Sequence, residues 1–178
     1  MSVWIFGYGS LIWRPSFPFV EKRRAWIDGF ARRLWQGSDD HRGVPGALGR
    51  VVTLVPMEGA RCVGVAFLIA DHEAEGVLAH LDHREKNGYQ RRPVDLKSEQ
   101  GVFAHGTVFV ADETNENFLG DASLDAIVAQ VRGSRGPSGD NTEYVLELAR
   151  ALRELDAHDN HVEAIARALA PAYAILGA

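Results

Sequence analysis

The sequence contains a single cysteine, Cys62, which excludes an internal disulfide. It has no run of about 20 apolar residues, the length that a membrane-spanning helix needs, and its N-terminus lacks the basic-then-apolar pattern of a signal peptide. Basic residues are not in excess, because the formal net charge is −5 and the pI is about 5.8. That balance argues against nucleic-acid or anionic-membrane partners. We therefore expect a cytoplasmic protein, and the composition is compatible with either a monomer or a dimer.

The pattern of the chain indicates an α+β fold in one domain, residues 1–178, because 178 residues with 46% hydrophobic content suit a single core. The predicted strands come first, at residues 24–35, 50–55, 61–69, 89–96 and 102–110. One predicted helix, 71–84, lies among them, and three more follow at 124–131, 141–155 and 162–169. Strands followed by helices favour a mostly antiparallel sheet that can close into a barrel. Gly64, inside a strand, suggests a bulge or a sharp barrel bend.

The first candidate site is a turn with two glycines that follows the apolar run 3–6. Glycine lets other groups approach the backbone closely, and successive N–H groups in such a turn can hold an anion or an oxyanion. The turn is not a dinucleotide fingerprint, because Ile12 stands where that motif needs its third Gly or Ala, and no lysine of a phosphate-binding loop is near. The alternative is a tight turn whose glycines serve only geometry.

A second candidate is Glu85, at the end of the predicted helix 71–84. A carboxylate there meets the negative pole of the helix dipole, and Asp82 adds a like charge on the same face. Both effects raise a carboxyl pKa toward the range of a general base, whereas Arg84 and Lys86 oppose them. The alternative is a solvated helix end.

Two further features have both a functional and a structural interpretation. The pairs His80/His83 and His158/His161 have ligand spacing but no third ligand at a fixed distance, so a zinc site is disfavoured. Tyr144, in the first turns of a predicted helix, either projects its hydroxyl toward the preceding Gly-rich loop or packs half-buried.

Six segments taken together resemble one enzyme family. They are residues 6–13, 35–38, 40–43, 49–54, 84–89 and 136–144. Each segment is a modest signal alone, but all six occur in family order and cover nearly the whole chain. On this basis the sequence resembles the ChaC-type glutathione-specific gamma-glutamylcyclotransferases.

The resemblance implies a small mixed β-barrel of the gamma-glutamylcyclotransferase type with flanking C-terminal helices. It implies cleavage of glutathione to 5-oxoproline and Cys-Gly without a cofactor or metal, with Glu85 as the catalytic residue. The implied substrate-binding residues are Gly7, Tyr8, Gly9, Ser10, Leu11, Ile12 and Tyr144. One departure is Leu48, where the family often has a second proline, a difference that bears on loop stiffness and leaves the chemistry untouched.

The implied reaction is an intramolecular amide exchange that needs no protein nucleophile. Our hypothesis is that Glu85 acts as general base and then as general acid, while N–H groups of the first turn hold either the α-carboxylate or the oxyanion. Besides a metal-dependent hydrolase, which insensitivity to a chelator would dismiss, two alternatives stay open. One is the same chemistry on another γ-glutamyl compound, and the other is a ligand-binding module without turnover, against which the presence of Glu85 argues.

Overall fold

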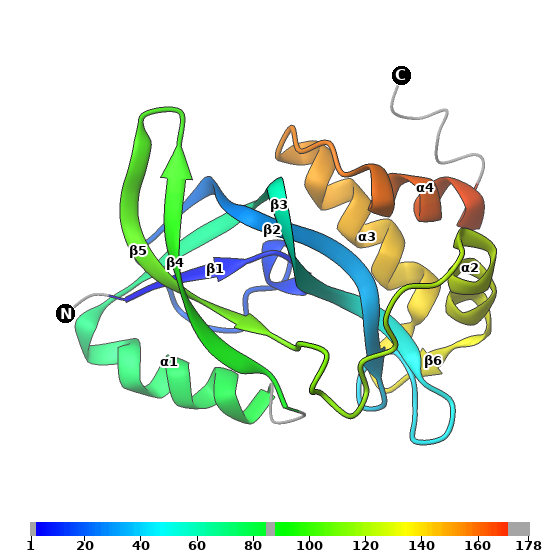
Figure 1. Cartoon of the computed structure of the whole chain (residues 1–178). Helices are drawn as coiled ribbons and strands as arrows, with labels where there is room; N and C mark the ends of the chain where they lie inside the picture. Colours follow the sequence, from blue (N-terminus) through cyan, green and yellow to red (C-terminus); the bar gives the residue numbers. More distant parts are fainter. Residues whose placement is uncertain (1–2, 85–87, 171–178) are drawn as a thin grey trace. The chain divides into compact units, whose positions relative to one another are not determined.

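The structure is a computed structural model that describes residues 3–84 and 88–170 (Figure 1). Its contacts divide it into two compact units. Unit 1 comprises Met1–Ala31 and Leu54–Glu116, and unit 2 comprises Arg32–Thr53 and Asn117–Ala178. The two longest strands contribute residues to both units. Within the described residues, no helix is both long enough and apolar enough to cross a membrane.

A closed barrel with the strand order β1-β3-β2-β4-β5 forms the centre of unit 1. Its strands are β1 (Val3–Gly7), β2 (Glu21–Ser38), β3 (Gly49–Ile69), β4 (Gln90–Ser98) and β5 (Gly101–Val110). β1 pairs antiparallel with β3, as β2 does with β4 and β4 with β5, whereas β1 and β5 pair in parallel. The predicted mixed, mostly antiparallel barrel is thereby confirmed. Its strands carry fully buried apolar side chains such as Ile5, Phe67 and Leu96.

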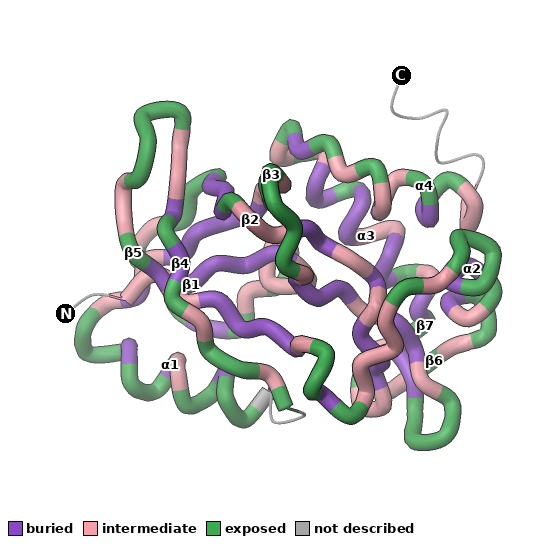
Figure 2. Tube along the Cα trace, viewed as in Figure 1, coloured by how far each residue is buried: buried purple, intermediate pink, exposed green. Residues whose placement is uncertain are grey.

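Among the described residues of unit 1, the one α-helix is α1 (Asp71–Arg84), with the bounds that the sequence predicts. Ala74, Val77 and Leu81 are buried at helical spacing, while the remaining face is largely exposed (Figure 2). Asp71 and Glu73 lie in the first turn, where carboxylates interact favourably with the helix dipole. An amphipathic stripe of this kind fixes which side of α1 is buried.

Unit 2 is mainly helical, with α2 (Leu124–Gly133), α3 (Asn141–Glu154) and α4 (Asn160–Leu169). A short hairpin connects α2 to α3, and its two strands, β6 (Arg135–Gly136) and β7 (Gly139–Asp140), have two residues each. The α4 helix begins two residues before the predicted start, because the Asp159 carboxylate caps it by accepting a hydrogen bond from the N–H of Val162 at 3.1 Å.

The structure corrects one strand prediction. Residues 50–55 and 61–69 were predicted as separate strands, but they form the single strand β3. The intervening residues 56–59 are exposed, so the period-2 burial pattern that marks a strand is missing there. Gly64 has a defined role in this strand, since a Cβ on it would lie 2.3 Å from the carbonyl oxygen of Gly7. The glycine therefore permits the close approach of β1.

Candidate functional site

The turn after β1 forms one compact substructure in unit 1. A Cβ on Gly7 would lie 2.9 Å from Cβ of Leu11, so only glycine fits where the chain folds back. Tyr8 is buried, and its hydroxyl donates a 2.7 Å hydrogen bond to the carbonyl of Phe109 on β5. The short helix Ser10–Ile12 completes the turn. The geometric requirement for glycine is thus established, and the binding role of the turn remains a prediction.

Backbone hydrogen bonds close the turn without using all of its N–H groups. The N–H of Ile12 donates to Gly9, and the N–H groups of Trp13 and Arg14 donate to Ser10. None of these bonds uses the N–H of Gly9 or Leu11, which belong to the stretch proposed to hold an anion. The structure therefore brings the six predicted residues 7–12 into one turn. The hydrogen bonds that close this turn do not involve the N–H groups of Gly9 and Leu11.

Glu85 lies outside the described residues, but the last turn of α1 before it is described. Arg91 at the start of β4 donates two hydrogen bonds to the carboxylate of Asp82, one of them from Nε to Oδ1 at 2.7 Å. The Arg91 guanidinium also lies 5.9 Å from the ring centroid of Phe109, whose carbonyl receives the Tyr8 hydroxyl. The like charge that Asp82 was expected to contribute is therefore offset by Arg91.

Tyr144 lies in unit 2, on the first turn of α3. It is buried, and its hydroxyl accepts a 3.1 Å hydrogen bond from the N–H of Val52 on β3. The guanidinium carbon of Arg42 lies 5.7 Å from its ring centroid. The tyrosine is thus more buried than the half-buried packing that was one alternative, and its ring faces a residue of the loop after β2.

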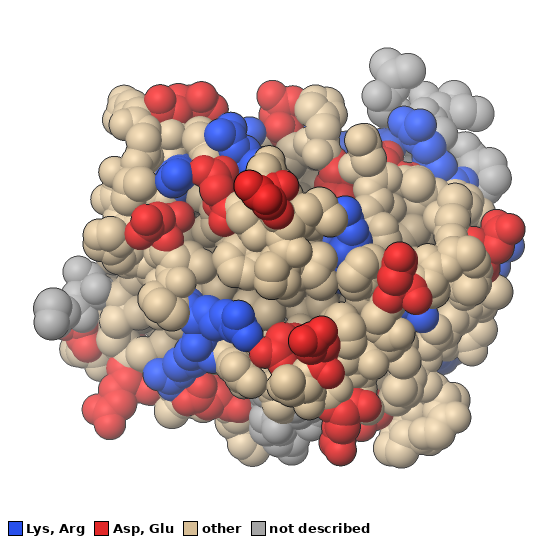
Figure 3. Space-filling view, in the orientation of Figure 1, with Lys and Arg blue, Asp and Glu red and all other residues tan. Residues whose placement is uncertain are grey.

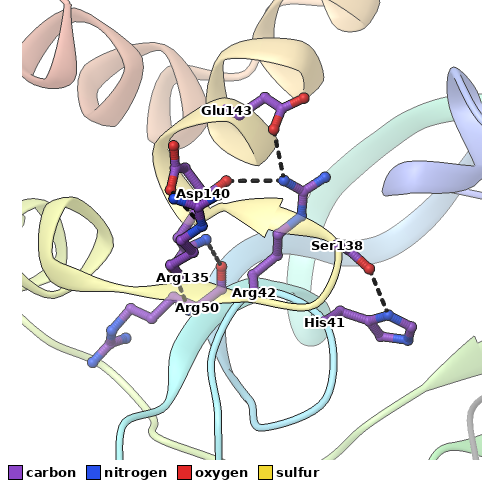
Figure 4. Close-up of polar contacts among 8 residues, drawn as sticks. His41, Arg42, Arg50, Arg135, Ser138, Asp140 and Glu143 are labelled. Atoms are coloured by element: carbon purple, nitrogen blue, oxygen red, sulfur yellow. Dashed lines mark hydrogen bonds and ion pairs between the residues drawn. The ribbon is translucent and has the colours of Figure 1, made fainter.

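A cluster of polar residues in unit 2 joins the loop after β2 to the β6–β7 hairpin and the start of α3, and the sequence did not single out its members (Figure 4). His41 Nδ1 and the Ser138 hydroxyl are 3.1 Å apart, and the N–H of Ser138 donates to the carbonyl of His41. These contacts join the loop after β2 to the β6–β7 hairpin. The signal was present in the sequence, because the segment 40–43 is among those that resemble the family.

Asn141 and Arg50 form the buried polar centre of this cluster. The Asn141 side chain is fully buried, accepts from the N–H of Arg50 at 2.7 Å and donates to its carbonyl at 2.8 Å. Arg50 donates from Nε to Gln130 and from Nη1 to the carbonyl of Leu34. Burial lowers the pKa of Arg50. A side chain that satisfies both backbone groups of one strand residue fixes α3 against β3.

The histidine pairs have other partners. His161 Nε2 accepts a 3.0 Å hydrogen bond from the N–H of Leu34, and His80 Nε2 lies 3.3 Å from the hydroxyl of Ser16. Over residues 3–84 and 88–170, no group of three or more His, Cys, Asp or Glu side chains is placed to hold a metal. On the face that Figure 3 shows, acidic and basic side chains are interspersed.

Comparisons with known proteins relate nearly the whole chain to one family. The family model described as ChaC-like protein matches residues 3–171. Gamma-glutamylcyclotransferase 2-3 of Arabidopsis thaliana is 40% identical over 93% of this chain and 87% of its own. Glutathione-specific gamma-glutamylcyclotransferase 1 is 38% identical in Danio rerio, over 94% of this chain and 89% of its own, and 36% identical in Homo sapiens, over 94% and 78%.

Solved structures give the same relationship. A crystal structure of a gamma-glutamyl cyclotransferase specific to glutathione from yeast superposes with a TM-score of 0.86 at 29% identity, covering 97% of this chain and 96% of that chain. A structure titled gamma-glutamyl cyclotransferase shares the fold at a TM-score of 0.57 and 15% identity, covering 93% and 86%.

Proposed function

The chain belongs to the ChaC-like family, and from this membership we propose that it degrades glutathione to 5-oxoproline and Cys-Gly. The observation that carries the proposal is the near full-length similarity to relatives and to a yeast structure that are named for glutathione-specific cyclotransfer. The mixed barrel is the fold of that yeast structure. The family model spans residues of both units, so we further propose that residues 1–178 act as one domain.

The reaction is an intramolecular acyl transfer. The α-amine of the γ-glutamyl group attacks its own γ-carbonyl, the amide bond to cysteine breaks, and a five-membered lactam forms. One proton leaves the attacking amine, and one proton reaches the departing amine of Cys-Gly. Because the nucleophile belongs to the substrate, the protein has to fold the substrate, which can lower the barrier by up to roughly 7–11 kcal/mol, and move protons.

Glu85 is the proposed proton carrier, first as general base and then as general acid. A carboxylate serves both steps because the proton it removes from the amine is the one it returns to the leaving group. The turn at residues 7–12 is proposed to bind the γ-glutamyl group through its N–H donors. Its fixed geometry supports this role, as does the placement of Tyr8 between β1 and β5. Tyr144 is proposed as a further substrate-binding residue.

The test compares wild type with Glu85→Gln, using metal-stripped protein and detection of 5-oxoproline and Cys-Gly by mass spectrometry. We expect kcat to fall at least about 100-fold with little change in KM, because the amide keeps the size but cannot carry the proton. Glu75→Gln is the matched control, since Glu75 is an exposed carboxylate on α1. Near-normal turnover by Glu85→Gln would move proton transfer to another group.

A second candidate is the same cyclisation on a different γ-glutamyl compound. It is favoured by the name of the Arabidopsis relative, which specifies gamma-glutamylcyclotransferase activity without naming glutathione. Product analysis across γ-glutamyl amino acids and amines separates the two candidates. A cytoplasmic location is also proposed, and it is supported by the single cysteine of the sequence, which excludes an internal disulfide.

A further inference from the structure

Arg42 is a buried cation that the proposed mechanism does not use. It lies in the loop after β2, within the segment 40–43, and its side chain is only 6% exposed. A buried arginine is expected to have its charge and its donors satisfied, because leaving them unpaired in a low-dielectric setting costs free energy. The partners of Arg42 therefore indicate its role.

Among the described residues, the hydrogen bonds of the Arg42 guanidinium all come from Nη1, and its carbon lies over the Tyr144 ring. Nη1 donates to the carbonyl of Asp140 at 2.9 Å and to Oε2 of Glu143 at 3.3 Å. Within residues 3–84 and 88–170, neither Nε nor Nη2 has an acceptor. In Figure 4 the second terminal nitrogen points away from Asp140 and Glu143. Arg50 differs, because its Nε and its Nη1 both donate, which leaves no edge with two unused nitrogens.

The unused edge of Arg42 has the geometry of a carboxylate receptor. Nε and Nη2 present two parallel N–H groups, and this fork matches the two oxygens of a carboxylate in a bidentate, charge-assisted pair. Glu143 does not occupy the fork, because its carboxylate contacts Nη1 alone and is itself more than half exposed. The site therefore suits a carboxylate ligand rather than a neutral one.

The position of Arg42 is fixed before any ligand binds. The Ser38 hydroxyl oxygen accepts hydrogen bonds from the N–H groups of His41 and Arg42. A Cβ on Gly49 would lie 2.2 Å from the carbonyl oxygen of Arg42, and a Cβ on Gly139 would lie 3.2 Å from its Nη1. Two glycines thus leave space for the backbone and the guanidinium of Arg42. Because the side chain is already ordered in the folded protein, binding a ligand does not carry the entropy cost of ordering it.

We propose that Arg42 is a specificity-determining residue that binds the glycine carboxylate of glutathione. This proposal rests on the proposed function. Glutathione carries two carboxylates, and Arg42 lies beside Tyr144, a residue of the same unit that is proposed to bind this substrate. The Cys-Gly carboxylate needs a cationic partner of its own, and a bidentate guanidinium distinguishes it from a neutral amide. A γ-glutamyl compound without this carboxylate would lose that contact.

The experiment measures kcat/KM for glutathione and for its glycine amide, in which a neutral carboxamide replaces the carboxylate. Wild type should prefer glutathione by about 10- to 100-fold, the range for loss of a hydrogen-bonded charged group. In Arg42→Gln, kcat/KM for glutathione should fall by about the same 10- to 100-fold, whereas kcat/KM for the amide should change little. The ratio of the two kcat/KM values should therefore fall close to one. Arg135→Gln is the matched control, because Arg135 is an exposed arginine in the adjacent hairpin, and it should keep the wild-type preference.

Several outcomes would overturn the proposal. Equal kcat/KM values of wild type for glutathione and its amide refute the proposal without any variant. An Arg42→Gln protein that keeps the wild-type preference for glutathione also refutes it. So does an Arg42→Gln protein whose kcat/KM falls by the same factor for both substrates. If Arg42→Gln does not fold, Arg42→Lys keeps the cation but not the fork, and an undiminished preference in that variant refutes bidentate recognition. Absence of 5-oxoproline from wild type and glutathione refutes the proposed function instead.

Discussion

His161 offers a direct test of the energetics of unit 2. Its Nε2 accepts from the N–H of Leu34, so the native state uses the neutral ring. Burial, aided by the guanidinium of Arg33, lowers the pKa of His161 from 6.5 to about 4, although the carboxylates of Asp159 and Asp121 act in the opposite direction. Protonation would place a second cation beside Arg33 and remove the acceptor for Leu34.

The sign and size of the effect follow from linkage. The unfolded chain binds a proton at His161 below about pH 6.5, whereas the native state does so only near pH 4. The stabilisation is complete above pH 6.5, is lost as the pH falls toward 4, and does not change further below both values. The pKa difference is worth about 3 kcal/mol at most, and we expect about 2 kcal/mol because the ring is partly exposed and water screens its charge.

Urea denaturation at pH 7.5 and at pH 4.5 measures this loss, with wild type and His161→Gln compared at each pH. Glutamine keeps a neutral acceptor and does not titrate, so the variant should lose about 1–2 kcal/mol less than wild type on acidification. His158→Gln is the control, because His158 is almost fully exposed and lies three residues away. Parallel losses in wild type and His161→Gln would refute the assignment of the acid sensitivity to this ring.

Three further substitutions test packing. Asn141→Ala leaves the buried N–H and C=O of Arg50 unpaired, and we expect a loss of about 2–4 kcal/mol in urea denaturation. Gly64→Ala places a Cβ 2.3 Å from the Gly7 carbonyl oxygen, and we expect a destabilisation of about 2–3 kcal/mol. Gly76→Ala, in the interior of α1 with open space around its Cβ, should stabilise by about 0.5–1 kcal/mol. Thermal melts showing the same sign for both glycines would contradict these expectations.

Local pattern predicts the elements of this chain well and their long-range partners poorly. Apolar residues at helical spacing predict α1, and the early start of α4 follows from an N-cap at Asp159. The sequence did not predict that β3 is one continuous strand, because strand prediction depends on alternating burial and residues 56–59 are all exposed. Of the proposed site, the turn at residues 7–12 could be found from its glycines.

The roles of Arg42 and Asn141 could not be found in this way. Asn141 bonds to a residue 91 positions away, and Arg42 to one 101 positions away. No periodicity in the sequence records such contacts. Polar residues in Gly-rich loops also look alike in a sequence, whether they are fully buried, as Asn141 is, or exposed, as Arg135 is. The resemblance of the segments 40–43 and 136–144 to a family marks them as important without assigning a task to each residue.

The structure divides those tasks in unit 2. A Cβ on Gly136 would lie 2.3 Å from the carbonyl oxygen of His41, Asn141 satisfies the backbone of β3, and the Tyr144 hydroxyl bonds to the same strand. These three residues therefore have structural reasons for their identity. In the part of the chain that the structure describes, Nε and Nη2 of Arg42 have no acceptor. Substitutions at Asn141 should accordingly lower the free energy of unfolding, whereas substitutions at Arg42 should lower the preference for glutathione over its amide. The two measurements therefore distinguish residues that stabilise the fold from a residue that recognises the substrate, within one cluster.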